Sequence, residues 1–359
     1  MPGPLDGVRV LELAGIGPGP YTCMLLSQLG ADVLRVDRPG GSRVGNPDLL
    51  ADGRPTYTLD LKNADDVATV LQLVERADVL VEGFRPGVAE RLGIGPDQCL
   101  AVNPRLVYAR MTGWGQDGPL ADKVGHDINY AGIVGAIGAI GEPGRKPVPP
   151  LNLVADFGGG ALFCLSGILA ALLERTTSGK GQVVDVAMVD GVASLMTMFW
   201  SMRANGGWSD DRGSNMLDGG APFYDTYECA DGEYVAVGAI EEQFWQQVVD
   251  GLGIQDAPPR SDLTRWAELR KRMQEVFLTK TRDEWSALFA DRPACVTPVL
   301  KLSEAPSHPH VQARTAMVEH DGVMRPNVAP RFSRTPTELP PAAGRPGALA
   351  GWGLSDQPS

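Results

Sequence analysis

His126 and Asp156 are the two side chains in this sequence best suited by type and neighbours to moving a proton. His126 stands in GHDINY, before an apolar, glycine-rich stretch (131–141) expected to be helical. A histidine at a helix N-terminus tends to stay neutral, and a neutral imidazole is a competent base near pH 7. Asp156 stands in NLVADFGGG, where the glycines would let a bulky ligand approach. Asn152, four residues earlier, could steady its carboxyl group.

Residue type alone leaves plainer interpretations open. His126 could cap or pack against a helix, Asp156 could be an N-cap, and Glu241 could be an ordinary acid in a first helical turn. The other histidines, His308, His310 and His320, lie in a proline-rich region. They are expected to be solvated, with a metal role for the first two left open.

The glycine-rich run GIGPGP (15–20) lies between an expected strand and an expected helix, and Asp37 ends the next strand. This arrangement approaches the dinucleotide-binding fingerprint. Two features oppose it, because the third glycine is out of place and the prolines remove N–H groups that would hold a phosphate. Arg38, a cation suited to phosphate, follows Asp37 directly. We therefore expect a tight turn or a modified ligand turn rather than an NAD site.

The elements that must position these residues alternate between strand and helix. Short apolar runs predict strands at 8–13, 31–36, 57–61, 79–84, 106–111 and 182–187. Helical spacing or apolar length predicts helices at 21–29, 64–77, 157–175 and 190–203. Such alternation with strands buried on both faces is typical of a parallel sheet between helices. The sequence therefore predicts an α/β fold with a large Rossmann-like domain.

A second, smaller unit is expected after an aperiodic, Gly-rich stretch. Two strands (223–229 and 234–240) precede three helical patterns (241–252, 263–278 and 282–289). Proline-rich chain then returns from Pro298 onward. The expected division is a large domain at 1–190 completed by 327–359, a linker at 191–224, a small α+β domain at 225–300 and a return linker at 301–326.

Composition excludes several classes of protein. The 359 residues carry a net charge of −12, which argues against a nucleic-acid-binding protein but allows a local cationic site for an anionic ligand. The five cysteines form no CxxC pair, so neither a disulfide framework nor a zinc site is expected. The N-terminus has no signal-peptide pattern, the C-terminal DQPS is no peroxisomal address, and the longest apolar stretch (161–173) is too short to cross a bilayer. These features favour a cytoplasmic protein without a membrane segment.

Several ordered blocks of the sequence resemble the family III CoA-transferase fold, and within it the α-methylacyl-CoA racemases. The blocks are ELAGIGPGPYTCMLLSQLGADVLRVDRPGG, LDLK, VEGFRPGVAERLG, ARMTGWGQDGP, GHDINY, DFGGGALFCLSGILAALLERTTSGKGQVVDVAMVDG and YDTYECADGEYVAVGAIE. The resemblance spans nearly the whole chain. It implies an interlocked homodimer in which the active site lies between the large domain of one subunit and the small domain of the other.

The resemblance also implies roles for individual residues. His126 and Asp156 match the facing proton-transfer pair, and Glu241 matches a glutamate that steadies the histidine across the dimer. Ile16 and Asn152 are supporting residues. Positions matching those that hold CoA are Arg38, Leu59, Asp60, Leu61, Lys62, Gly83, Phe84, Arg85 and Arg91. The loop matching the one that meets the thioester and pantetheine comprises Gly125, Asp127, Ile128, Asn129 and Tyr130.

The implied reaction is the interconversion of (R)- and (S)-2-methylacyl-CoA thioesters through an enolate. No metal and no cofactor is expected, since CoA is part of the substrate. Transferases of this fold use an aspartate at the position of Asp156 as an acyl nucleophile, so a CoA-transferase is the alternative. His126 favours the racemase, because the transferases usually lack a histidine in this loop. A CoA-thioester-binding protein without chemistry is the other alternative.

Overall fold

The computed structural model describes residues 3–41, 45, 47–341, 344 and 348–355. The C-terminal DQPS and part of the segment 327–359 therefore lie outside the described residues. The chain divides into two compact units: unit 1 comprises Met1–Val134, Leu151–Met196 and Ala313–Ser359, and unit 2 comprises Gly135–Pro150 and Thr197–Gln312. The segment Gly135–Pro150, which the sequence analysis placed in the large domain, thus groups with the smaller unit. The domain boundaries drawn from the sequence stay a prediction.

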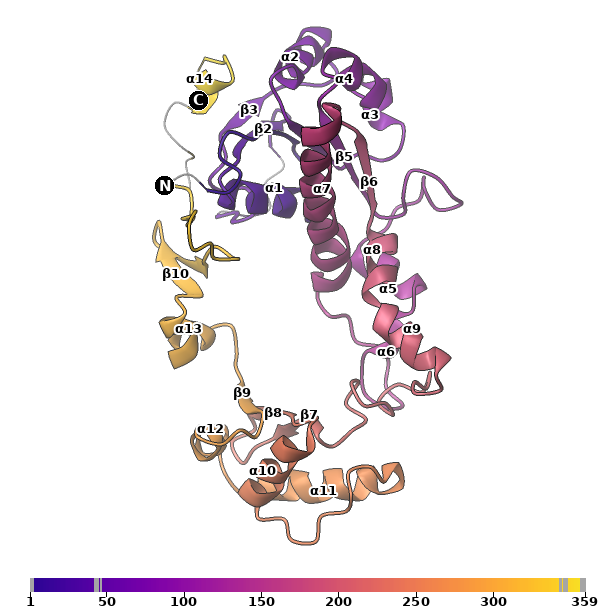
Figure 1. Cartoon of the computed structure of the whole chain (residues 1–359), viewed down its shortest axis with the longest axis vertical. Coiled ribbons are helices and arrows are strands. Elements are labelled where there is room, and N and C mark those ends of the chain that lie inside the picture. Colours follow the sequence, from indigo (N-terminus) through magenta and orange to yellow (C-terminus); the bar gives the residue numbers. More distant parts are fainter. Residues whose placement is uncertain (1–2, 42–44, 46, 342–343, 345–347, 356–359) are drawn as a thin grey trace. The chain divides into compact units, whose positions relative to one another are not determined.

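Unit 1 is built on a six-stranded sheet in the order β3-β2-β1-β4-β5-β6. Figure 1 labels four of these strands, β2, β3, β5 and β6. The strands are β1 (Arg9–Leu13), β2 (Asp32–Asp37), β3 (Thr56–Thr58), β4 (Val79–Glu82), β5 (Val107–Thr112) and β6 (Val183–Ala187). All neighbouring strands are parallel. This is the doubly wound order, whose direction reverses between β1 and β4. The α/β class expected from the sequence is confirmed.

Both faces of the sheet are covered, as the apolar strands predict. The helices of unit 1 are α1 (Pro18–Gln28), α2 (Ala64–Val74), α3 (Val88–Arg91), α4 (Pro96–Val102), α5 (Asp127–Ile133), the π-helical segment η1 (Leu153–Leu162), α7 (Phe163–Ser178), α8 (Met188–Leu195) and α14 (Ala348–Gly351). Alternate strand residues such as Leu11 and Leu80 are buried with α2, α4 and Trp352 of the tail. Helix α1 contacts β1 and β2, and α7 contacts β5 and β6. The C-terminal part of unit 1, which begins at Ala313, also forms a hairpin, β10 (Met317–His320) with β11 (Val323–Pro326).

Two helices differ from the expectation. The helix expected from residue 157 begins earlier, as η1, with Asn152 at its N-cap position. Asp156 is therefore not an N-cap and lies in the first turn instead. The helix expected over 190–203 is broken at Met196, between α8 and α9 (Thr197–Ala204).

Glycines allow η1 and α8 to pack at very short range. A Cβ on Gly191 would lie 1.9 Å from the carbonyl oxygen of Gly159, and a Cβ on Gly159 would lie 2.8 Å from the nitrogen of Val192. No other residue type fits such a contact. The GGG run is thus a packing device that seats the segment carrying Asp156 against α8.

Unit 2 is an α+β structure around an antiparallel sheet, β7 (Tyr224–Glu228), β8 (Tyr234–Gly238) and β9 (Val296–Val299). Its helical elements are α6 (Ala136–Ala139), α9, α10 (Glu242–Leu252), η2 (Leu263–Arg265), α11 (Trp266–Phe277), α12 (Arg282–Phe289), η3 (Ala305–Ser307) and most of α13 (Pro309–Ala313). A core that includes Tyr227, Phe277 and Trp285 holds the sheet to the helices. Strand β9 is an addition to the two strands expected here.

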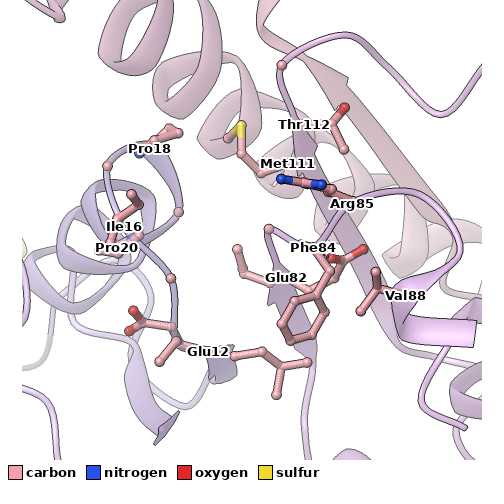
Figure 2. A pocket seen from close by; sticks show the side chains of 18 of the residues that line it. Glu12, Ile16, Pro18, Pro20, Glu82, Phe84, Arg85, Val88, Met111 and Thr112 are labelled. Carbon is pink, nitrogen blue, oxygen red and sulfur yellow. Dashed lines mark hydrogen bonds between the residues drawn. The ribbon is translucent and has the colours of Figure 1, made fainter. Parts of the chain in front are cut away.

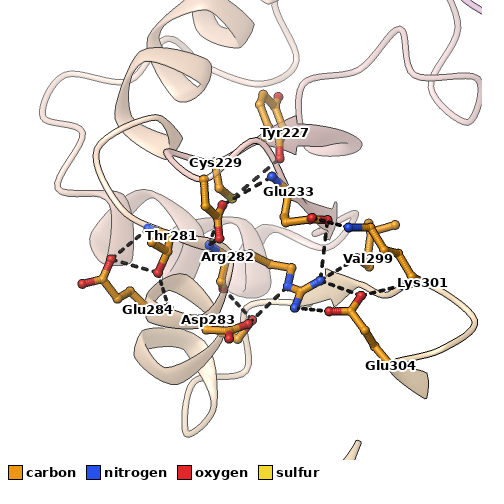
Figure 3. Close-up of polar contacts among 12 residues, drawn as sticks. Tyr227, Cys229, Glu233, Thr281, Arg282, Asp283, Glu284, Val299, Lys301 and Glu304 are labelled. Atoms are coloured by element: carbon orange, nitrogen blue, oxygen red, sulfur yellow. Dashed lines mark hydrogen bonds and ion pairs between the residues drawn. The ribbon is translucent and has the colours of Figure 1, made fainter. Parts of the chain in front are cut away.

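A polar cluster ties the chain after β9 to the start of α12 (Figure 3). Arg282 donates to both carboxylate oxygens of Glu304, at 2.8 and 3.1 Å, and lies 3.8 Å from Glu233. Lys301 donates to Glu233 at 2.5 Å. The pairing with Arg282 holds the pKa of Glu304 at about 2. Arg282 is buried, so its network is a structural anchor for the returning chain.

The continuous helix Leu153–Ser178 has 26 residues and is apolar enough, by length and composition alone, to cross a membrane. It is longer than the apolar stretch considered in the sequence. Cys164, Ile168 and Ala171 are buried in unit 1, whereas Leu173 is 72% exposed. The chain's own core thus covers one side of this helix and leaves apolar side chains on another. The cytoplasmic location stays a prediction.

Candidate active site

A cavity of about 1130 Å³ opens in unit 1 at the point where the strand order reverses. Its walls come from the carboxyl ends of β1 and β4 and from the turns that follow them (Figure 2). Ile16, Pro18 and Pro20 lie on one side, and Phe84 and Arg85 lie across from them. Ligands of open α/β sheets bind in this crevice. The volume exceeds the usual range for drug-sized ligands, so it suits a large one.

Most of the residues singled out from the sequence line this one cavity. They are Ile16, Arg38, Leu59, Asp60, Leu61, Lys62, Gly83, Phe84, Arg85, Gly125, His126, Tyr130, Asn152 and Asp156. They come from six separate stretches of the chain, which the parallel sheet brings to one edge. The cavity therefore brings together the expected proton-transfer pair and three of the four expected CoA-binding cations, Arg38, Lys62 and Arg85.

Five of the singled-out residues do not line the cavity: Arg91, Asp127, Ile128, Asn129 and Glu241. Arg91 ends α3, with its guanidinium beside the backbone of Gly87. Asp127 and Asn129 each accept the backbone N–H of a residue that lines the cavity, Asp156 and His126 respectively, as described below. Glu241 belongs to unit 2, where it holds the N-cap position of α10. Its role stays a prediction.

The expected proton-transfer pair, His126 and Asp156, lies at two helix starts. His126 is at the N-cap position of α5, and the side chain of Asn129 accepts its N–H at 3.0 Å. Asp156, in the first turn of η1, accepts from the amide of Asn152 at 3.1 Å, as expected from the sequence. Burial raises the pKa of Asp156, the charge of Asp127 raises it further, and Asn152 and His126 act in the opposite direction. A carboxyl group of this kind is more readily protonated than an ordinary one.

The run GIGPGP makes the turn into α1 and passes beside Asp156. Gly17 has a φ of 69°, and a Cβ there would lie 3.2 Å from Oδ2 of Asp156. Phe157, the next residue after Asp156, packs on Tyr21 of α1, with ring centroids 4.5 Å apart. The motif therefore forms the part of the cavity wall next to the carboxyl group of Asp156. The turn lines the cavity, and its role in holding a ligand stays a prediction.

A buried ion-pair network holds the turn that carries Phe84 and Arg85. Glu82 accepts the N–H of Phe84 at 2.6 Å and Nε of Arg110 at 3.0 Å. Arg110 also pairs with Glu90 of α3 at 2.8 Å. One arginine of β5 thus fixes both the β4–α3 turn and α3 itself. Burial raises the pKa of Glu82, although its bonds to Phe84 and Arg110 oppose this.

The loop before His126 is clamped by an aromatic pair. Tyr130 donates its hydroxyl to the carbonyl of Gly125 and meets Trp114 edge to face, at 4.7 Å between centroids. A Cβ on Gly113 would lie only 2.1 Å from the Tyr130 ring. Burial raises the pKa of Tyr130, and the charge of Asp156 adds to this. Tyr130 therefore serves as a wall and as a brace for the histidine loop.

Several lining residues were missed in the sequence: Glu12, Glu82, Met111, Trp114 and Lys123. A carboxylate inside an otherwise apolar strand is a signal that would have found Glu12 and Glu82, which are each 1% exposed. Lys123 adds a fourth cation to the lining, beside Arg38, Lys62 and Arg85. Among the described residues, no group of three or more His, Cys, Asp or Glu could hold a metal ion.

Comparison with known proteins shows the family of this chain. The model of "CoA-transferase family III" matches residues 5–348. The chain is 47% identical to the alpha-methylacyl-CoA racemase of Mus musculus, over 92% of this chain and 87% of the relative. It is 44% identical to the enzyme of that name from Homo sapiens, with the same coverage. A solved CAIB/BAIF family protein from Brucella suis superposes with a TM-score of 0.85 at 26% identity, covering 98% of both chains. The resemblance read from the sequence is confirmed, and the chain belongs to CoA-transferase family III.

Proposed function

We propose that this chain is an isomerase that interconverts the (R) and (S) forms of 2-methylacyl-CoA thioesters. One observation carries the proposal: an imidazole and a carboxyl group of raised pKa line the same cavity, in a chain similar to racemases over 92% of its length. Inversion requires two acid–base groups, because a single base would return the proton to the face it came from. His126 and Asp156 supply them.

In one direction, neutral His126 removes the α-proton from the (S) face and leaves a thioester enolate. Protonated Asp156 then delivers its proton to the opposite face of the same carbon. His126 ends protonated and Asp156 ionised, which is the state that the reverse reaction needs. The raised pKa of Asp156 favours this acid role, whereas an acyl nucleophile must be ionised.

The enolate oxygen requires hydrogen-bond donors. First-turn N–H groups of a helix have no acceptor within the helix, and the N–H of Asp127 at the first position of α5 is our candidate. The cations Arg38, Lys62, Arg85 and Lys123 of the lining are suited to the phosphates of CoA. The reaction needs no further cofactor, because the thioester itself acidifies the α-carbon.

The working unit in this proposal is an interlocked homodimer, in which Glu241 of one subunit steadies His126 of the other. The exposed apolar side chains on the long helix, Leu162, Phe163 and Leu173, support a protein partner for that helix. Sedimentation should give a dimer free of detergent. A monomer, or extraction only with detergent, would contradict this part of the proposal.

Subunit complementation tests the placement of Glu241. His126→Ala and Glu241→Ala subunits should each form nearly inactive dimers. When the two are co-expressed, a mixed dimer regains one site with both residues, so activity should recover to about a quarter of the wild-type value. No recovery would place Glu241 in the same subunit's site or outside it.

Deuterium incorporation decides the reaction. A racemase in D₂O should place deuterium on Cα and invert it without any second acid. His126→Ala or Asp156→Asn should lower the rate by roughly 10²–10⁴-fold and leave CoA binding largely intact. An acyl-enzyme trapped by hydroxylamine, with CoA exchange into a free acid, would instead establish the transferase. Binding without either reaction would leave a CoA-thioester-binding protein.

A further inference from the structure

Asp127 is a buried carboxylate directly next to His126 in the chain, and its side chain has no part in the mechanism above. It is 5% exposed and lies behind the wall of the cavity rather than in it. Its Oδ2 accepts the N–H of Ala155 at 2.6 Å and the N–H of Asp156 at 2.8 Å. The residue after one proton-transfer group is thus bonded to the backbone of the other.

This contact joins two helix starts. Asp127 is the first residue of α5, while Ala155 and Asp156 lie in the first turn of η1. N–H groups at the start of a helix lack an acceptor within it, so a carboxylate there completes the turn with charge-assisted bonds. His126 is therefore linked to the backbone N–H of Asp156 through one peptide bond, the short side chain of Asp127 and one hydrogen bond.

The other carboxylate oxygen of Asp127, Oδ1, is buried without a hydrogen-bond partner in the described part of the chain. Both N–H groups therefore use Oδ2 alone, and an amide oxygen in its place could accept the same two bonds. Burial is the main cause of the raised pKa of Asp156, and the charge of Asp127 adds to it by less than the Asn152 hydrogen bond takes away. The main effect of Asp127 is therefore on the position of the segment that carries Asp156, through its two hydrogen bonds.

We propose that Asp127 is a positioning residue, which fixes the carboxyl group of Asp156 opposite His126 across the α-carbon. This inference rests on the proposed racemase reaction. Without the tether, His126 still removes a proton from the (S) isomer, but Asp156 delivers poorly and the enolate takes its proton back from His126. Exchange should then become separated from inversion.

Two variants separate geometry from charge. Both N–H groups use one oxygen, so Asp127→Asn keeps that acceptor, loses the charge and places its NH₂ at the unpartnered position. Asp127→Glu keeps the charge and displaces the acceptor by one methylene. Each variant would be incubated in D₂O with (S)- or (R)-2-methyldecanoyl-CoA, and deuterium with retention would be measured against deuterium with inversion. This ratio does not depend on how much enzyme is folded.

With the (S) isomer, Asp127→Glu should raise the retention-to-inversion ratio about tenfold, since misplacement by 1 Å can cost roughly 10²-fold. The ratio for Asp127→Asn, which keeps the acceptor in place, should stay within about twofold of wild type. With the (R) isomer, Asp127→Glu should slow exchange and inversion together. A wild-type ratio in Asp127→Glu, or equal changes in both variants, would overturn the inference. Failure of the wild type to invert its substrate would overturn the proposed function instead.

Discussion

Replacing Gly17 by alanine should slow the proposed reaction by crowding the carboxyl group of Asp156, its proposed acid. The φ of 69° places Gly17 in the left-handed region, where a Cβ costs roughly 1–2 kcal/mol. The added methyl group would lie 3.2 Å from Oδ2 and 3.7 Å from Cγ of Asp156. The carboxyl group must therefore shift by a few tenths of an ångström. Since a misplacement of 1 Å can cost roughly 10²-fold, we expect kcat to fall by about 3- to 10-fold.

Gly7 provides the matched control, since its φ is 84° and a Cβ there would meet nothing within 4 Å. Both variants should lose about 1 kcal/mol of unfolding free energy in urea titrations. Only Gly17→Ala should lose turnover when inversion is followed by chiral analysis of the product. Equal losses of kcat in the two variants, or full activity of Gly17→Ala, would refute the steric argument.

Three further predictions concern the surroundings of the site. The pH profile of kcat/KM should have the same bell shape in both directions, because in each direction the active form of the enzyme holds a single proton on the pair His126 and Asp156. Asn152→Ala removes a hydrogen bond that lowers the pKa of Asp156, so the acid limb of the profile should move to higher pH. Glu82→Ala removes the carboxylate that holds the β4–α3 turn and should raise KM for a CoA thioester about tenfold, which corresponds to roughly 1.4 kcal/mol. KM for an N-acetylcysteamine thioester, which lacks the nucleotide, should not rise. Gly191→Ala would place a Cβ 1.9 Å from the Gly159 carbonyl oxygen and should lower the unfolding free energy by about 3 kcal/mol; an unchanged thermal midpoint would contradict this.

Four strands of unit 1, β1, β2, β4 and β5, could be located from the sequence because they are short, mostly apolar runs that are buried over most of their length. Val79–Glu82 and Val107–Thr112 illustrate this, since every residue in both strands is buried. Periodicity located the strands but not their order in the sheet, because neighbours such as β1 and β4 are far apart in the chain. The glycine run at 15–20 was expected to be a turn between a strand and a helix, and it leads into α1, yet nothing local indicated that Gly17 lies beside Asp156.

The helix starts were harder to predict, and they matter more for the site. Asn152 at the N-cap position of η1 gives no side-chain capping bond, so the usual local start signal is absent. The acceptor that completes this start is Asp127, 28 residues earlier in the chain. Likewise, no Pro precedes the break at Met196, which lies between two apolar segments of helical spacing. Contacts distant in sequence decide these boundaries, so a local pattern could not.

The same carboxyl position can serve two reactions, and its surroundings decide between them. An aspartate that attacks a thioester must be ionised and free to approach the carbonyl carbon. Here burial and the nearby charge of Asp127 favour the protonated form, and Asn152 holds the carboxyl group by a hydrogen bond. An imidazole lines the same cavity and can accept the proton that leaves the substrate. Changing only His126 should therefore abolish inversion without creating a transferase, because the carboxyl group would remain in an environment that suits an acid.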